Sequence, residues 1–216
     1  MSSSLAAHLS RRPGAARAVP DVVLKGVGHT YSSGASRPVL ALTPTDLTID
    51  GGAMVALVGP AGSGKSTLLE ILAGTFLPTA GEVLLGGAPV AGPGRGGLVI
   101  RPSESAEPRA DIARALATRP HLLLLDEPFA GTDSSDRERR QEELRSIWKE
   151  TGTTIVVATR RAVDAVPLAT RVLVLSAGPG EIVRDVHVDF AQRDLPVGVL
   201  QADPDLARFT AQLRVA

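Results

Sequence analysis

The chain has 216 residues, no cysteine, and equal numbers of basic and acidic side chains, 23 Lys and Arg against 23 Asp and Glu. Without cysteine there is no disulfide framework, no thiolate metal site and no thiol nucleophile. The formal net charge of zero gives no support for a nucleic-acid partner, because such domains usually carry a basic excess. No apolar run approaches the roughly 18 residues that a membrane span needs. These features predict a soluble intracellular protein with one domain of ordinary size.

Residues 1–20 differ in composition from the rest of the chain. They contain Arg11, Arg12 and Arg17 among several Ser and Ala, and the first acidic residue is Asp21. This composition resembles an organellar transit peptide. We favour a disordered leader, because the segment has neither an apolar h-region nor a clear helical face.

Two short strand patterns follow the leader, at residues 22–27 and 40–49, where apolar residues are spaced by polar ones. Tyr31 lies between them and is the only tyrosine of the chain. The two patterns predict a small antiparallel sheet before the first chemical motif.

The segment Gly59-Pro-Ala-Gly-Ser-Gly-Lys-Ser66 fits the phosphate-loop pattern G-x-x-x-x-G-K-[ST] at every fixed position. An apolar run at 54–58 predicts a buried strand before it, and residues 66–73 predict the helix that follows. The glycines allow successive backbone N–H groups to point at an anion bound at the helix N-terminus. Lys65 is then expected to reach the β- and γ-phosphates, and the Ser66 hydroxyl to bind Mg²⁺. This motif predicts a site for a nucleoside triphosphate.

Strand patterns alternate with helix patterns through the rest of the chain. Residues 91–97 predict a loop, and residues 133–148 a helix that Asp133 can cap. Further strands are predicted at residues 82–85, 98–100, 122–125, 154–157, 171–175 and 181–190, and further helices at 107–118 and 203–213. Strand and helix alternation indicates parallel βαβ units. The expected organisation is a leader at 1–20, a nucleotide-binding domain at 21–200 and a C-terminal helix at 201–216.

A second chemical motif ends the strand at residues 122–125, which Asp126 and Glu127 follow directly. Open α/β sheets bind ligands at the carboxyl ends of their strands. Asp126 is expected to hold Mg²⁺, and Glu127 to orient and deprotonate the water that attacks the γ-phosphate. Two carboxylates without a Cys/His cluster favour Mg²⁺ over Zn²⁺.

Three segments together, 59–67, 112–120 and 122–129, resemble the ATP-binding subunits of ABC transporters. Residues 82–90 and the hairpin at 172–183 resemble the branch that serves nitrate, sulfonate and taurine importers. The resemblance covers about residues 20–190. It implies a P-loop α/β core, with a mainly parallel sheet flanked by helices and a small antiparallel N-terminal β-subdomain.

The resemblance also implies residue roles. Tyr31 falls where an aromatic ring stacks on adenine, with a purely structural hairpin tyrosine as the alternative. Asp133 matches the D-loop aspartate that faces a partner subunit. The residues expected to bind nucleotide are Tyr31, Gly59, Pro60, Ala61, Gly62, Ser63, Gly64, Lys65, Ser66 and Thr67. Lys65 and Glu127 are the expected catalytic residues, and Ser66 and Asp126 the metal ligands.

The chain departs from the family pattern at three places. Arg101 stands where the family has a glutamine that senses Mg²⁺ and the γ-phosphate. The helical subdomain that should follow, with the groove for the transmembrane subunit, is missing, and the signature LSGGQ has become Pro102-Ser-Glu-Ser-Ala106. Arg160 replaces the switch histidine; it can contact phosphate, but its permanent charge prevents it from shuttling a proton.

The sequence therefore predicts the ATP-binding, Mg-ATP-hydrolysing subunit of an ABC-type importer, with impaired activity. A degenerate regulatory subunit, with little hydrolysis and no transport coupling, is the alternative. A small-molecule phosphotransferase would need an acceptor pocket or lid, for which the sequence offers no segment. The expected partners are a permease and a second ATP-binding subunit, as a homo- or heterodimer. The expected location is cytoplasmic, including the inner face of the plasma membrane.

Overall fold

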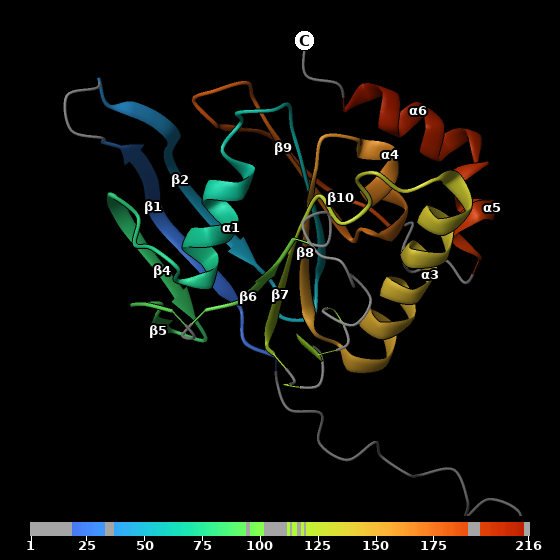
Figure 1. Ribbon diagram of the computed structural model, residues 1–216, viewed down its shortest axis with the longest axis horizontal. Helices are drawn as coiled ribbons and strands as arrows, with labels where there is room; N and C mark the ends of the chain where they lie inside the picture. Colours follow the sequence, from blue (N-terminus) through green and yellow to red (C-terminus); the bar gives the residue numbers. More distant parts are fainter. Residues whose placement is uncertain are drawn as a thin grey trace, which may run out of the picture.

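The computed structural model describes residues 19–32, 37–93, 96–101, 112, 114–115, 118, 120–189 and 195–213. Within these residues the chain forms two sheets with helices packed against them (Figure 1). The leader up to residue 18, most of the helix expected at 107–118 and the signature at 102–106 lie outside the described residues.

The smaller sheet is antiparallel and has the strand order β2-β1-β4-β5. Its strands are β1 (Val22–Tyr31), β2 (Val39–Ile49), β4 (Ala80–Leu85) and β5 (Ala88–Pro89). This sheet confirms the expected antiparallel piece. The prediction that the first strand ends at residue 27 was too short, because β1 continues to Tyr31, which pairs with Val39 of β2.

The larger sheet has six strands in the order β10-β9-β3-β8-β7-β6 and is parallel except for its edge strand β10. Its strands are β3 (Met54–Val58), β6 (Leu98–Ile100), β7 (Leu122–Asp126), β8 (Thr154–Thr159), β9 (Arg171–Leu175) and β10 (Ile182–His187). Strands β3, β7 and β8 are buried along their whole length, as expected for parallel strands covered on both faces. Their carboxyl ends meet at one edge of the sheet, where the phosphate loop follows β3, Glu127 follows β7 and Arg160 follows β8.

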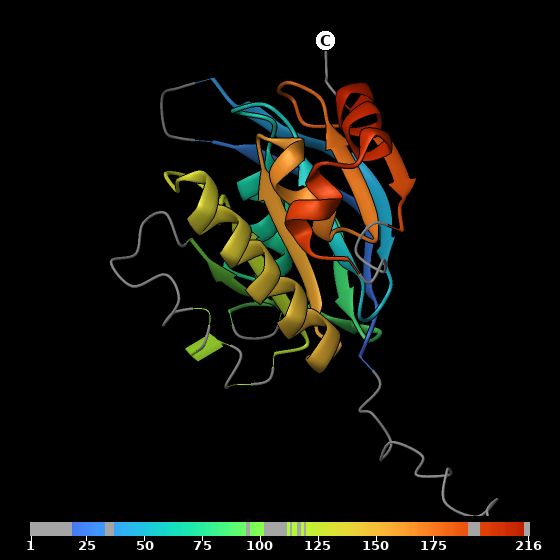
Figure 2. The same cartoon turned by 90° about the vertical axis from the view of Figure 1, so that its right-hand side faces the viewer.

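Helices cover both faces of the larger sheet (Figure 2). The named helical elements are α1 (Lys65–Ala73), α3 (Ser134–Thr151), α4 (Ala162–Ala165), a 3₁₀ turn (Val166–Leu168), α5 (Val197–Gln201) and α6 (Pro204–Gln212). Helix α1 packs between the two sheets and shares one apolar core with them. Helices α3 and α6 and the 3₁₀ turn share the second core, on the opposite face. The mixed α/β architecture predicted from the sequence is confirmed.

The C-terminal elements differ from their sequence patterns in two respects. The strand expected at 181–190 is the shorter β10, and most of its side chains are exposed because it lies at the sheet edge. Helix α5 was not predicted, since five residues are too few to show a helical period. Helix α6 forms as expected: the side chain of Asp203 caps it, and Leu206 packs into the second core. None of the described helices is long and apolar enough to cross a membrane.

Arg171 on β9 joins three strands. Its Nε and Nη2 lie 2.7 and 2.6 Å from the two carboxylate oxygens of Asp185 on β10, and its Nη1 donates to the Thr48 carbonyl of β2. The hydrogen bonds from Arg171 lower the pKa of Asp185 below its ordinary value. The ion pair therefore contributes stability above the unfolded-state pKa, and this contribution disappears as the pH falls through the lower folded-state pKa.

We expect Asp185→Asn to lower the free energy of unfolding at neutral pH by up to about 1 kcal/mol. The value is small because the carboxylate is 40% exposed and solvent screens the pair. Denaturant titrations of both proteins at pH 7 and at acidic pH should show the difference shrinking once Asp185 is protonated. Equal stabilities at every pH would contradict a stabilising role for this ion pair.

Candidate nucleotide-binding site

The phosphate loop joins the end of β3 to the start of α1. Gly62 and Gly64 adopt left-handed backbone angles, with φ of 76° and 77°. A Cβ atom added to Gly64 would lie 2.6 Å from the Ala41 carbonyl oxygen, so this position requires glycine for space as well as for backbone conformation. The loop thus has the backbone curvature that an anion nest needs.

Lys65 folds back over the loop and is only 6% exposed. Its ammonium donates hydrogen bonds to the carbonyls of Gly59 (2.8 Å) and Pro60 (2.7 Å) and to Ser63 Oγ (3.2 Å). Burial lowers the pKa of Lys65, and the carboxylates of Glu127 and Asp126 partly oppose this shift. A buried ammonium favours an anionic ligand, because phosphate oxygens supply charge that the loop carbonyls lack.

A cavity of about 610 Å³ lies over the loop. Its lining brings Tyr31 at the end of β1 together with Gly62–Thr67 and with Gly178 and Pro179 from the turn between β9 and β10. Of the other predicted contacts, Gly59 and Pro60 line a separate cavity of about 430 Å³ beside Arg160, and Ala61 is exposed on the loop.

Tyr31 is 45% exposed, which leaves part of its surface open to a ligand. It packs edge-on against His29, with ring centroids 4.6 Å apart. The Tyr31 hydroxyl lies 3.1 Å from Thr67 Oγ1 at the start of α1. The side chain is therefore held beside the phosphate loop.

The turn between β9 and β10 was predicted only as a tight turn, and the structure packs it against the loop. Gly180 donates its N–H to the Ala41 carbonyl at 2.9 Å and accepts from the Thr43 N–H at 2.9 Å. A Cβ on Gly180 would lie 2.2 Å from the Ser63 carbonyl oxygen. The Pro179-Gly180 pair was a signal for a turn, but no local pattern indicates what a turn will pack against.

Asp126 is the last residue of β7, and Glu127 follows it at the same sheet edge. Asp126 is 6% exposed. Glu127 has a φ of 48°, the one positive φ recorded outside glycine in the described chain, and its N–H donates to the Ala158 carbonyl. Backbone strain of this kind collects at functional sites, where the surrounding structure holds a side chain in a required direction.

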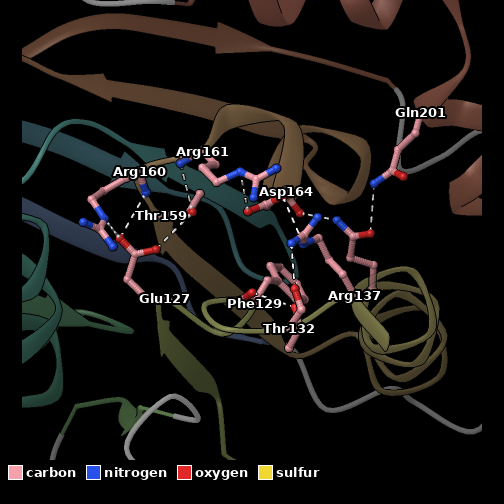
Figure 3. A network of polar contacts seen from close by, with 10 residues as sticks. Glu127, Phe129, Thr132, Arg137, Thr159, Arg160, Arg161, Asp164 and Gln201 are labelled. Atoms are coloured by element: carbon pink, nitrogen blue, oxygen red, sulfur yellow. Dashed lines mark hydrogen bonds and ion pairs between the residues drawn. The ribbon is translucent and has the colours of Figure 1, made fainter. Parts of the chain in front are cut away.

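The carboxylate of Glu127 is already engaged within the chain (Figure 3). Its Oε1 accepts from the backbone N–H (3.1 Å) and the Nε (3.2 Å) of Arg160, and its Oε2 accepts from Thr159 Oγ1 (3.3 Å). We expected Arg160 to be available to phosphate. In the structure its guanidinium pairs with the predicted base instead, because β7 and β8 are neighbours and both residues follow the ends of these strands.

Arg101 follows β6 and contacts two acidic side chains. Its guanidinium forms an ion pair with Glu70 of α1, and its Nε lies 3.6 Å from Oδ2 of Asp126. Strand register produces the second contact, since Ile100 is paired with Leu125 and the next residues emerge side by side. Arg101 and Arg160, the two arginines that we expected to depart from the family pattern, are therefore paired with carboxylates of the predicted site.

A chain of polar contacts continues from Glu127 toward α3 (Figure 3). Thr159 Oγ1 accepts from the Arg161 N–H, and Arg161 and Arg137 lie 3.4 and 3.6 Å from the two carboxylate oxygens of Asp164. Burial raises the pKa of Asp164, against the effect of the two arginines. Asp133, the predicted D-loop residue, uses its carboxylate to cap α3 through the Asp136 N–H. The sequence did not single out Asp164, which has no motif around it.

Comparison with known proteins places this chain in a family. The ABC transporter family model matches residues 42–106. The taurine import ATP-binding protein TauB of Yersinia pestis bv. Antiqua is 33% identical over 220 residues, which cover 76% of this chain and 86% of that protein. This chain belongs to the ABC transporter ATP-binding family. TauB of Escherichia coli (strain K12) is 29% identical, over 77% of this chain and 85% of that protein.

Solved ABC cassettes share the fold. The ATP-binding cassette MJ0796, in a dimeric post-hydrolysis state with ADP and Pi, superposes with a TM-score of 0.64 and is 25% identical, over 77% of this chain and 98% of that chain. CbiO1 of Clostridium perfringens, part of the transporter complex cbiONQ, has a TM-score of 0.67 at 20% identity, over 90% of this chain and 98% of that chain. The second likeness concerns the fold alone.

Proposed function

We propose that the chain is the ATP-binding subunit of an importer and that it binds ATP between Tyr31 and the phosphate loop. The observation that carries this proposal is the cavity that joins Tyr31, at the end of a strand of the smaller sheet, to Gly62–Thr67 of the phosphate loop and the start of α1. The names of the TauB relatives support a taurine-like solute. A permease and a second ATP-binding subunit are the proposed partners, and the dimeric MJ0796 cassette supports the second.

Within this proposal Lys65 holds the β- and γ-phosphates, and Glu127 is the base for the attacking water. The Ser66 hydroxyl and the Asp126 carboxylate are oxygen donors of the kind that Mg²⁺ prefers, so they are the groups that would hold a magnesium ion that displaced Arg101 from Asp126. Bound there, Mg²⁺ would neutralise phosphate charge. The nearby guanidinium of Arg101, 3.6 Å from Asp126, shares the same carboxylate.

A regulatory subunit with little hydrolysis is the second proposed function, and the Glu127–Arg160 pair supports it. A base whose carboxylate already accepts two hydrogen bonds from Arg160 is less free to accept a proton from water. The alignment with TauB is 220 positions long but includes only 76% of this 216-residue chain. TauB therefore has residues at aligned positions where this chain has none. A missing helical subdomain between β6 and β7 would account for such positions.

Titration calorimetry with ATP tests the nucleotide site. Lys65→Ala removes the buried ammonium, and we expect ATP to bind more weakly by about 1–3 kcal/mol, the range of a charge-assisted contact. Lys149→Ala, on the last turn of α3, is the matched control and should bind ATP as the unchanged protein does. Equal ATP affinity in the Lys65→Ala and unchanged proteins would remove the basis for the proposed site.

Tyr31 variants separate stacking on the base from the hydrogen bond to Thr67. We expect Tyr31→Ala to weaken ATP binding by about 1–3 kcal/mol, as for aromatic side chains that stack on bases. Tyr31→Phe and Tyr31→Trp should retain most of the affinity, because stacking needs the ring and not the hydroxyl. If Tyr31→Phe loses as much affinity as Tyr31→Ala, the bond to Thr67 is what matters. If all three bind alike and only the alanine variant melts earlier, Tyr31 is a packing residue.

A further inference from the structure

Arg101 contacts Asp126, one of the two groups that we propose as metal ligands, and Glu70, a helix neighbour of the other, Ser66. The Oδ2 of Asp126 is 3.6 Å from Arg101 Nε. The other end of the guanidinium pairs with Glu70. Glu70 stands four residues after Ser66 on α1, so the two side chains share one face of that helix, one turn apart.

This arrangement provides a fixed cation where a divalent cation would otherwise balance the carboxylate. The Asp126 side chain is 8% exposed and the Glu70 side chain 14% exposed, so both carboxylates need a nearby positive charge. In the part of the chain that the structure describes, the ion pairs of both carboxylates are made to Arg101. Arginine keeps its charge at every physiological pH.

We propose that Arg101 acts as a built-in cation at the magnesium position, so that this chain binds nucleotide without needing a divalent metal ion. The proposal rests on the nucleotide site proposed above. Phosphate oxygens that enter beside Ser66 approach a guanidinium held by Glu70 and Asp126, and such groups bind phosphate through charge-assisted hydrogen bonds. A metal ion entering the same place must compete with the guanidinium for Asp126.

A purely structural ion pair is the simpler explanation of the same contacts. It predicts that Arg101 affects stability and leaves the metal dependence of nucleotide binding unchanged. The Arg101 side chain is 34% exposed, so a solvent-facing part of it remains accessible to a ligand. The two explanations therefore differ in a quantity that can be measured directly, the ratio of nucleotide affinities with and without metal.

The experiment is an ADP titration of the full chain by calorimetry, with excess Mg²⁺ and then with EDTA. We expect the ADP affinity of the unchanged protein to differ by no more than about threefold between the Mg²⁺ and EDTA buffers. For Arg101→Gln we expect the ADP affinity in EDTA to be about tenfold or more below its affinity in Mg²⁺, since one charge-assisted contact is lost. Arg101→Lys keeps the charge and should retain metal-independent binding. Arg208→Gln, an arginine on α6 whose side chain is 77% exposed, is the matched control.

Mn²⁺ gives a second readout that does not depend on turnover. In the presence of ADP, the electron paramagnetic resonance signal of free Mn²⁺ should change little on adding the unchanged protein and should fall on adding Arg101→Gln. If ADP binding depends on Mg²⁺ as strongly in the unchanged protein as in Arg101→Gln, the proposal for Arg101 is overturned, while the nucleotide site itself stands. No ADP binding by any variant in either buffer, with circular dichroism showing folded protein, would overturn the nucleotide site itself.

Discussion

Glu127→Gln is expected to lower the rate of ATP hydrolysis by about 10²–10⁴-fold, the usual contribution of a positioned general base. Glutamine has nearly the same shape as glutamate, so the amide can keep the hydrogen bond from the Arg160 N–H, but it cannot take a proton from water. The measurement is a single-turnover assay of labelled phosphate release, because the unchanged chain is expected to be slow. If Glu127→Gln hydrolyses ATP at the unchanged rate while Lys65→Ala does not, Glu127 is not the base.

The companion variant of this test is Arg160→His, which removes the guanidinium that pairs with Glu127 Oε1. We expect its turnover to rise by about 10–100-fold, since the carboxylate is released and a group that can shuttle a proton is introduced. Adding Glu127→Gln to Arg160→His should cancel the gain. A gain that survives in the double variant would show that Arg160 restrains the site by another route, such as direct contact with phosphate.

Leu123→Ala is expected to lower the free energy of unfolding by about 2–5 kcal/mol. Leu123 is 0% exposed in β7 and belongs to the core between the larger sheet and helices α3 and α6. Removing its side-chain carbons leaves a cavity that neighbouring side chains can only partly fill. Denaturant unfolding, followed by circular dichroism, measures the change.

Leu98→Ala is a closely matched control, because Leu98 of β6 is the register partner of Leu123 and is 40% exposed. The same chemical change there should cost well under half as much, since little apolar surface returns to water. Similar losses at both positions would mean that β6 is packed more tightly than its exposure indicates. The comparison also tests whether β7, the strand that leads to Asp126 and Glu127, is buried in the core.

The sequence by itself determined the phosphate loop, the carboxylate pair at the end of β7 and the order of most strands and helices along the chain, but not the short elements β5, α4 and α5. Each of these is a local feature. The spacing of glycine and lysine in Gly59–Ser66 suits the backbone that an anion nest needs. Fully apolar runs such as Leu122–Leu125 indicate strands buried on both faces. Those local patterns were enough to predict the mixed α/β fold and the sheet edge at which the site lies.

Only the tertiary structure decided which residues meet at that edge. That Arg101 reaches Asp126, and Arg160 reaches Glu127, depends on β6 and β8 lying on either side of β7. The sequence identified both arginines as departures from the family pattern, but the spacing between them says nothing about sheet order. The end of β1 at Tyr31 was likewise set by pairing with β2 rather than by its own apolar pattern. Strand order and register arise from how the whole core packs, so contacts between residues far apart in the chain cannot be deduced from any one segment.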